Sequence, residues 1–198
     1  MILSRAILET PVGEMLALDS GEGLCALEFT GPEKRLVGLE ARLRRWFPPH
    51  DIVDGETPTI ALTREWLDGY FAGVSADISG LPLDMRGADF EKRVWGALRR
   101  ITPGETTSYG AIAKALGSAG ASRAVGAANG ANPIAIVVPC HRVIGASGSL
   151  TGYGGGLDRK LWLLDHERSH WPAAVEGKGQ RAKGKGEGQG LLFPSPSP

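Results

Sequence analysis

Short apolar runs alternate with tight turns over the first thirty residues of the chain. The runs at residues 5–10, 14–19 and 24–29 are rich in aliphatic side chains and short enough to be strands. Turn-forming residues at 11–13 and 20–23 separate them. We therefore expect three strands joined by tight connections.

Apolar residues then recur at helical spacing in two longer stretches. Residues 32–47 and 62–73 each carry leucine and aromatic side chains three or four positions apart, which is typical of a helix with one buried face. A short strand is expected at 80–85. We place a domain boundary at Gly87, so that residues 1–85 form an N-terminal α/β domain.

Three shorter helices follow, each preceded by a residue that can cap it. Their ranges and expected caps are 90–101 with Asp89, 109–116 with Ser108, and 123–130 with Ser122. A Gly/Ser turn joins the second and third helices, which is the spacing of a helix-turn-helix. Antiparallel helix pairs of this kind are also frequent in ordinary cores, so both interpretations stay open.

An aliphatic run at 134–138 leads to the most unusual motif of the chain. Pro139 cannot donate a ladder hydrogen bond and is expected to end a strand, so that Cys140 and His141 lie at a turn. A Gly/Ser-rich turn and a final amphipathic helix at 157–167 come next.

Glycine, lysine, glutamine, proline and serine dominate residues 172–198, which predicts a disordered tail. Its one apolar island contains Gln189, Leu192 and Phe193. These positions resemble the Gln-x-x-Leu-Phe peptide with which bacterial proteins dock on the sliding clamp. An accidental apolar cluster is the alternative, since so short a pattern has many false matches.

Charge is unevenly distributed along the 198 residues, although the formal net charge is zero. Residues 1–88 carry a net charge of −6, residues 89–171 carry +4 and the tail carries +2. The basic middle segment contains Cys140 and is compatible with a surface that faces phosphates.

The chain has two cysteines, Cys25 and Cys140, so no disulfide framework is expected and a reducing cytoplasm is the default location. The N-terminal stretch lacks the apolar region of a signal peptide, and no stretch approaches the roughly 20 apolar residues of a membrane-spanning helix. The N-terminal domain offers only Cys25 and His50 as cysteine or histidine ligands, so we predict no metal and no cofactor.

Two interpretations of Cys140 compete on the residues alone. An unbridged cysteine beside aliphatic residues is most often a buried small hydrophobe. His141 and Arg142 follow at once, however, and such groups favour the nucleophilic thiolate. Neighbouring side chains of an extended chain point to opposite faces, so His141 is expected to act through a bend or a water. Glu167 could orient an imidazole, and Asn132 could fix the turn.

Four motifs place these residues in a known pattern. They are VPCHRVIGASGSLTGYGGGLDRKLWLLDHE (138–167), TTSYGAIAKALG (106–117), SRAVGAANGANP (122–133) and FEKRVWGAL (90–98). Over about residues 86–168 they closely resemble the O(6)-alkylguanine-DNA alkyltransferases, also called methylated-DNA–protein-cysteine methyltransferases. The resemblance implies an α+β fold, with a ribonuclease-H-like α/β domain (1–85) followed by a winged helix-turn-helix catalytic domain (86–171).

The same resemblance implies an activity on alkylated double-stranded DNA. The protein, expected to be a monomer, would flip the damaged base through the minor groove. It would then move the alkyl group of O(6)-alkylguanine, and also of O(4)-alkylthymine, onto Cys140 in a single turnover. His141 would be the base, acting through water and oriented by Glu167, while Asn132 would hold the turn. Tyr109 would lie against the flipped nucleotide and stabilise the leaving group.

Two further groups of residues are carried over by motif position. The DNA-binding group comprises Ser108, Arg123, Ala124, Gly126, Ala127, Asn129 and Gly130. Within it, Arg123 would enter the duplex where the base has left. The substrate pocket comprises Tyr109, Val143, Tyr153, Gly154, Gly155 and Lys160. On the residues alone, Tyr109 and Tyr153 could instead be core aromatics and Lys160 a surface charge.

Two rival functions remain at this point. A lesion-binding protein without transfer chemistry is one, and the presence of Cys140 argues against it. A winged-helix regulator is the other, and it would not need Asn132, His141 and Glu167 together.

Overall fold

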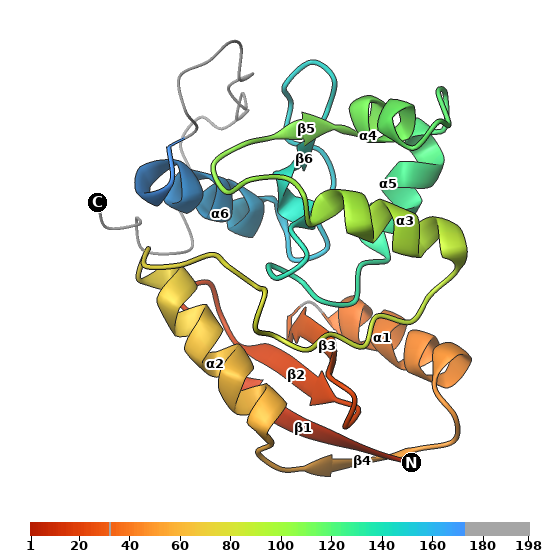
Figure 1. Cartoon of the computed structure of the whole chain (residues 1–198), viewed down its shortest axis with the longest axis vertical. Coiled ribbons are helices and arrows are strands. Elements are labelled where there is room, and N and C mark those ends of the chain that lie inside the picture. The colour runs from red at the N-terminus through yellow and green to blue at the C-terminus, as the bar shows by residue number, and fades with distance from the viewer. Residues whose placement is uncertain (32, 173–198) are drawn as a thin grey trace. The chain divides into compact units, whose positions relative to one another are not determined.

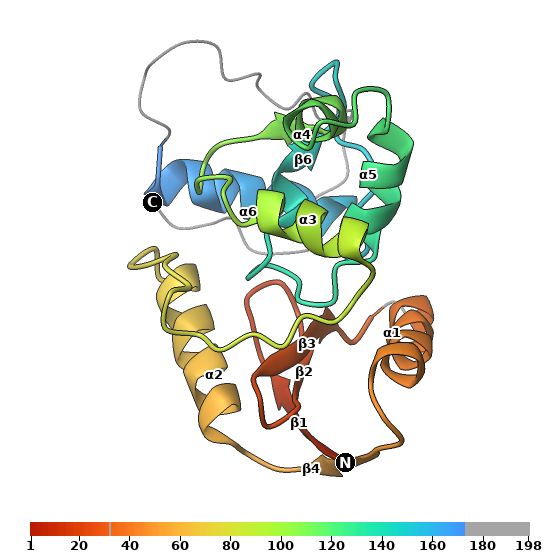
Figure 2. The ribbon, with the colours of Figure 1, turned by 45° about the vertical axis from the view of Figure 1, so that its right-hand side comes forward.

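A computed structural model of the chain describes residues 1–31 and 33–172, and these residues form two compact units. Among the described residues, the first unit comprises Met1–Ala88 with Pro133–Val137, and the second comprises Asp89–Asn132 with residues 138–172. Figures 1 and 2 show the elements of each unit from two directions. The predicted disordered tail lies outside the described residues after Pro172, and so does its clamp-like peptide.

The first unit is built on a four-stranded sheet with the strand order β3-β2-β1-β4. Its strands are β1 (Ile2–Leu8), β2 (Met15–Asp19), β3 (Leu24–Phe29) and β4 (Asp51–Asp54). β1 pairs antiparallel with β2 and parallel with β4, while β2 pairs antiparallel with β3. The three strands expected from the sequence are confirmed. β4 was not predicted, because it is short, exposed throughout and without apolar periodicity.

Helices α1 (Glu33–Trp46) and α2 (Pro58–Phe71) lie on opposite sides of this sheet, as Figure 2 shows. Under α1, an apolar cluster joins helix and sheet residues. It includes Leu3, Leu18, Cys25, Leu39, Leu43 and Phe47. α2 begins before the predicted residue 62, because Thr57 accepts a hydrogen bond from Ile60 N–H (3.2 Å) and Pro58 suits the first helical position.

The strand predicted after α2 forms only one bridging pair with β3, between Leu83 and Leu24. Leu24 N–H donates to the Pro82 carbonyl (2.9 Å), and Asp84 N–H donates to the Leu24 carbonyl (3.0 Å). Gly23 permits this approach, because a Cβ at that position would lie 2.8 Å from the Pro82 backbone. The prediction of a strand at 80–85 was wrong, because the pairing does not continue beyond this contact.

The aliphatic run that was expected to be a strand is also irregular. Ile134 pairs with Leu27 of β3, and then Val137 N–H donates back to the Ala135 carbonyl (2.8 Å) around Ile136. The φ of Ile136 is 66°, a left-handed conformation that is costly for a β-branched residue. Burial of its side chain holds the residue there. The strand prediction for 134–138 was wrong because this tight turn interrupts it.

The second unit combines helices with one small parallel sheet. Its elements are α3 (Asp89–Leu98), β5 (Thr107–Ser108), α4 (Tyr109–Ala115), α5 (Ser122–Gly130), the 3₁₀ turn η1 (Cys140–Arg142), β6 (Val143–Ile144) and α6 (Leu157–His170). β5 and β6 pair in parallel, which places the start of α4 beside the residues that follow η1.

Only one of the three predicted helix caps in this unit is confirmed. Ser108 Oγ accepts a hydrogen bond from Ala111 N–H (3.1 Å) at the start of α4. Asp89 and Ser122 lie inside the first turns of α3 and α5 instead, and no side chain caps α5. α6 also runs past its predicted end, to His170. No helix in the described part of the chain has the length and hydrophobicity needed to cross a membrane.

Candidate active site

Cys140 begins a tight turn. Pro139, with φ −80° and ψ 64°, is the central residue of an inverse γ-turn in which Cys140 N–H donates to the Val138 carbonyl (2.7 Å). Arg142 N–H then donates to the Pro139 carbonyl (3.1 Å). Because the proline ring presets φ, Pro139 fixes the direction in which the cysteine side chain leaves the backbone.

Two asparagines hold the backbone of this turn through their side-chain amides. Asn132 Nδ2 donates to the Val138 carbonyl (2.8 Å), and Asn129 Nδ2 donates to the Cys140 carbonyl (3.3 Å). Asn132 thus occupies the place expected for it. Asn129 was expected on the DNA-binding surface, and this expectation is corrected. It is buried on the inner face of α5 together with Val125, and its amide points to the turn.

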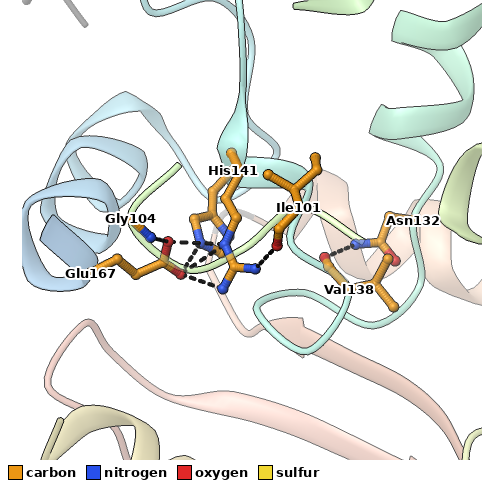
Figure 3. A network of polar contacts seen from close by, with 7 residues as sticks. Ile101, Gly104, Asn132, Val138, His141 and Glu167 are labelled. Atoms are coloured by element: carbon orange, nitrogen blue, oxygen red, sulfur yellow. Dashed lines mark hydrogen bonds and ion pairs between the residues drawn. The ribbon is translucent and has the colours of Figure 1, made fainter. Parts of the chain in front are cut away.

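A buried ionic network adjoins the turn (Figure 3). His141 Nε2 lies 2.8 Å from Oε1 of Glu167 on α6. Arg142 reaches both oxygens of the same carboxylate, with Nε at 3.1 and 2.9 Å and Nη2 at 2.7 Å. Gly104 N–H donates to Oε2 (3.2 Å), and Arg142 Nη1 donates to the Ile101 carbonyl. The network therefore ties α6 both to η1 and to the segment after α3.

These contacts set the protonation states in the network. Burial raises the pKa of the Glu167 carboxyl, but His141 and Arg142 outweigh burial and hold that pKa well below its usual range. Burial lowers the pKa of His141 against the opposing effect of Glu167. The ionised carboxylate can only accept, so Nε2 of the neutral imidazole carries the hydrogen and Nδ1 carries the lone pair. Among the described residues, Nδ1 has no hydrogen-bond partner.

Lys160 of α6 brings a second cation into the site. Its side chain is fully buried, and Nζ donates to the carbonyls of Val143 (2.6 Å) and Thr151 (2.7 Å). Burial lowers the pKa of Lys160 to about 8, while negative charge on Cys140 acts in the opposite direction. The two side chains are thus close enough to interact, and an ammonium group favours the thiolate over the thiol. The alternative that Lys160 is a surface charge is excluded by its burial.

The site therefore combines a buried thiol, a neutral imidazole with an available lone pair and a buried ammonium group. This combination can activate a sulfur nucleophile. In residues 1–31 and 33–172, the structure brings together no group of three or more His, Cys, Asp or Glu side chains that could hold a metal ion.

Comparisons with known proteins point to one family. Residues 89–169 match the family described as "6-O-methylguanine DNA methyltransferase, DNA binding domain". The crystal structure of Mycobacterium tuberculosis OGT in complex with DNA aligns with a TM-score of 0.70 and 41% identity, covering 87% of this chain and 96% of that one. The O6-methylguanine-DNA methyltransferase of Pyrococcus kodakaraensis strain KOD1 aligns with a TM-score of 0.60 and 28% identity, covering 83% and 98%.

A curated relative decides the assignment. The methylated-DNA–protein-cysteine methyltransferase of Mycolicibacterium paratuberculosis is 63% identical over 162 residues, which are 82% of this chain and 96% of that protein. The chain belongs to the methylated-DNA–protein-cysteine methyltransferase family. The resemblance drawn from the motifs is confirmed, as is the expectation of an enzyme of this class. The mixed α+β fold, with small sheets and helices, is also shared with the family's solved structures.

Most of the DNA-binding residues expected for this methyltransferase lie on one exposed face of α5. The exposed members are Arg123, Ala124, Ala127 and Gly130. Gly126 is half-buried against Tyr109, since a Cβ at this glycine would lie 3.8 Å from Cδ1 of the tyrosine ring. Ser108 caps α4 directly before Tyr109. The structure thus brings the predicted DNA-binding residues and Tyr109 together on α4 and α5.

The predicted substrate-pocket residues differ in burial. The Tyr153 ring packs edge-on against His141, with ring centroids 6.4 Å apart. Val143 is fully buried directly after η1, and its carbonyl accepts from Lys160. The two glycines belong to the loop after Tyr153, where Gly154 is half-buried and Gly155 is buried.

Sequence reasoning left Arg142 out of the site of this methyltransferase. It treated the residue only as a nearby positive charge, whereas the side chain is buried at the centre of the Glu167 network. A signal was available, because an arginine in an otherwise apolar segment must be paired if that segment is buried. The contact of Gly104 with Glu167 had no such signal, since a backbone amide leaves no pattern in the sequence.

Proposed function

We propose that this methyltransferase repairs DNA by moving the alkyl group of O(6)-alkylguanine in duplex DNA onto Cys140, once per molecule. The observation that carries the proposal is the surroundings of the thiol. Within one unit, Cys140 adjoins a neutral imidazole whose Nδ1 lone pair has no partner in the described chain, and a buried ammonium group interacts with it.

The chemistry follows from these residue types. The thiol proton passes to Nδ1 of His141, directly or through one water, and Glu167 stabilises the imidazolium that forms. The thiolate sulfur attacks the alkyl carbon, so that an S–C bond forms while the C–O6 bond breaks. Charge that develops on the purine is stabilised by the Tyr109 hydroxyl. The guanine takes up one proton from solvent, and the imidazolium of His141 releases one to solvent, so that the protons balance. A thioether has no easy leaving step, so Cys140 is consumed.

DNA recognition is assigned to residues 86–171 as a winged helix-turn-helix domain. The exposed face of α5 carries Arg123 and otherwise small side chains, which lets its backbone approach a duplex closely. The target atom is unreachable in a stacked base, so the base must be extruded through the minor groove, at a cost of a few kcal/mol. Arg123 would offset part of that cost by filling the gap. The family match over residues 89–169 and the DNA complex of the M. tuberculosis protein support this assignment.

The remaining parts of the proposal concern the rest of the chain. Residues 1–85 are proposed to be a ribonuclease-H-like domain, supported by the order β3-β2-β1-β4 with a parallel β1–β4 pair. We also propose that the protein acts as a monomer in the cytoplasm, where an unbridged thiol stays reduced.

The deciding experiment is mass measurement on the protein and its peptides after incubation with a duplex that carries one O(6)-methylguanine. A gain of one methylene on the Cys140 peptide is expected, up to one per molecule, with none after incubation with unmodified duplex. A duplex with O(4)-methylthymine, run in parallel, tests the second substrate. Lesion binding without a mass gain would support a lesion-binding protein instead. Indifference to the lesion would support a regulator.

The tail peptide is a separate proposal that rests on the sequence alone. Gln189, Leu192 and Phe193 are proposed to dock on a sliding clamp, as an extended segment does in a peptide groove. The double substitution Leu192→Ala with Phe193→Ala should abolish clamp binding in surface plasmon resonance. Unchanged binding, or none in the unsubstituted chain, would refute it.

A further inference from the structure

Arg142 is bound to Glu167 by three hydrogen bonds, and the proposed alkyl transfer assigns no role to this pairing. Its guanidinium group donates to both carboxylate oxygens, and the two side chains are 7% and 0% exposed. A planar fork on a carboxylate is the strongest form of such a pair and leaves the carboxylate nearly neutralised. His141 therefore faces a carboxylate whose charge is already compensated.

Compensation matters because a buried carboxylate on its own would draw a proton onto the imidazole. An opposite charge within about 4–6 Å raises the pKa of a histidine, and the effect grows when water is excluded. His141 is fully buried and 2.8 Å from Glu167. Burial favours the neutral imidazole, whereas the charge of Glu167 favours the imidazolium and that of Arg142 opposes it. Without the counter-charge, Glu167 would be opposed only by burial and by Lys160, and a proton drawn onto Nδ1 would occupy the site that must accept one from the thiol.

We propose that Arg142 is a positioning residue that keeps His141 neutral, and its Nδ1 lone pair available, by neutralising Glu167. The inference rests on the proposed alkyl transfer in one respect, namely that the Nδ1 lone pair accepts the thiol proton. The effect of Arg142 on the protonation of His141 does not depend on that function. The guanidinium group of Arg142 donates to Glu167 and to the Ile101 carbonyl. Arg142 therefore acts on the imidazole through Glu167 and is not itself a catalytic residue.

The other charged groups near His141 cannot replace Arg142. From α6, Lys160 also disfavours the imidazolium, but its ammonium group is bound to two carbonyls and does not contact the carboxylate. The segment after α3 contributes only the Ile101 carbonyl and the Gly104 N–H to the network, and the charged Arg99 and Arg100 before it are exposed. Within residues 1–31 and 33–172, the other titratable side chains beside His141 are the thiol of Cys140 in the same turn and the phenol of Tyr153, whose ring packs on the imidazole.

The test measures the protonation of His141 directly, by ¹⁵N NMR of the imidazole nitrogens as a function of pH. In the unsubstituted protein, Nε2 is expected to carry hydrogen and Nδ1 to be bare at pH 7. In Arg142→Gln the titration midpoint should rise by about one pH unit or more, as expected for an uncompensated carboxylate. Arg142→Lys keeps the charge and should stay near the parent value. Arg168→Gln, which removes an exposed arginine of α6, is the matched control and should leave the midpoint unchanged.

The rate of methyl transfer to Cys140 provides a second readout on the same variants. The acidic limb of its pH profile should move upward in Arg142→Gln, with the rate recovering at higher pH. A merely structural role would lower the rate at all pH values without moving the limb. If no variant or parent transfers a methyl group, the proposed function fails, but the NMR midpoints still test the role of Arg142.

Removing one partner of a buried ion pair is strongly destabilising, so Arg142→Gln could fail to fold. In that case two other proteins decide. The double variant Arg142→Gln with Glu167→Gln should fold with a neutral His141, because both charges are gone. Arg142→Lys should likewise keep His141 neutral. A charged imidazole at pH 7 in either protein would overturn the proposal, as would an unmoved midpoint in folded Arg142→Gln.

Discussion

The two cysteines of the chain are almost equally buried, yet they lie in opposite electrostatic surroundings. Cys25 of β3 is 2% exposed and Cys140 is 7% exposed, and neither forms a disulfide. Burial, together with the neighbouring Asp84 and Asp19, raises the pKa of Cys25 to about 12. Cys140, by contrast, interacts with the buried ammonium group of Lys160.

The difference shows that burial by itself makes a cysteine inert. A low-dielectric surrounding disfavours the thiolate, so a buried nucleophile needs a cation and a base buried with it. A buried cation and a buried base are costly unless they are hydrogen-bonded. Here Lys160 donates to two backbone carbonyls, and the base His141 is bonded to Glu167. At Cys25 the charge of Arg86 is outweighed by burial and by two carboxylates, and the residue serves as a small apolar side chain in the cluster under α1.

The largest expected effect is on alkyl transfer itself. Cys140→Ala should abolish methyl transfer from O(6)-methylguanine DNA, because the acceptor sulfur is gone. Cys25→Ala should retain it, since its thiol stays protonated up to strongly alkaline pH. Quantifying the methylated protein by mass spectrometry checks both variants. A methyl group found on Cys25 would break the contrast between the two cysteines.

A smaller but still large effect is expected for Glu167→Gln. The amide can donate to His141 Nε2 and so favour the tautomer in which Nδ1 carries the hydrogen, which removes the base. The rate of methyl transfer should fall by about 10²-fold or more. Asp165→Asn, in the same helix and paired with Arg168, is the control and should transfer at the parent rate. Equal losses in both variants would point to damage to α6 rather than to the base.

The support of the Cys140 turn should be visible as stability. Asn132→Ala and Asn129→Ala each remove one of the two donors to a buried carbonyl of the turn, because Val138 and Cys140 also accept from the backbone N–H groups of Cys140 and Val143. Each should lower the free energy of unfolding by about 0.5–1.5 kcal/mol. Urea denaturation measures this, with Ser147→Ala in an exposed loop as the control. Unchanged stability in both asparagine variants would mean that the turn does not depend on these amides.

The smallest effect concerns Cys25 at alkaline pH. Its pKa is about 12 in the folded protein against a reference value of 9.0, so between these values the folded state binds more protons than the unfolded one. Stability must therefore fall as pH rises above 9, by about 1.4 kcal/mol per pH unit from this group. The free energy of unfolding should therefore fall less between pH 7.5 and pH 10 in Cys25→Ala than in the parent protein. An unchanged loss would assign it to other groups.

Local signals in the sequence were the most reliable. The cap at Ser108 and the strands β1 to β3 depend on neighbouring residues, and both were predicted. β4 has no apolar pattern, and its existence depends on pairing with β1, which no local signal reports. The irregular run around Ile136 had the composition of a strand, but its conformation is imposed by burial and by the bridge from Ile134 to β3.

At the site, too, residues in local motifs were predicted, whereas contacts that depend on the tertiary structure were not. The motifs pointed to Cys140, His141 and Glu167, and the structure places the histidine against the glutamate. Which face of α5 turns inward could not be read from a helix made almost entirely of small residues, and so Asn129 was assigned to the wrong face. Arg142 was undervalued because its partner Glu167 lies 25 positions away in the sequence.

The carboxylate of Glu167 also holds a backbone amide far from the thiol in sequence. Gly104 N–H donates to the same group that orients His141. The short stretch after Gly104 leads through β5 directly into α4, where Tyr109 is the first residue. The Glu167 carboxylate thus holds both the base that activates the sulfur and the segment that leads to Tyr109. Substitutions at position 167 will not separate the two functions, whereas substitutions at Arg123 and Cys140 can.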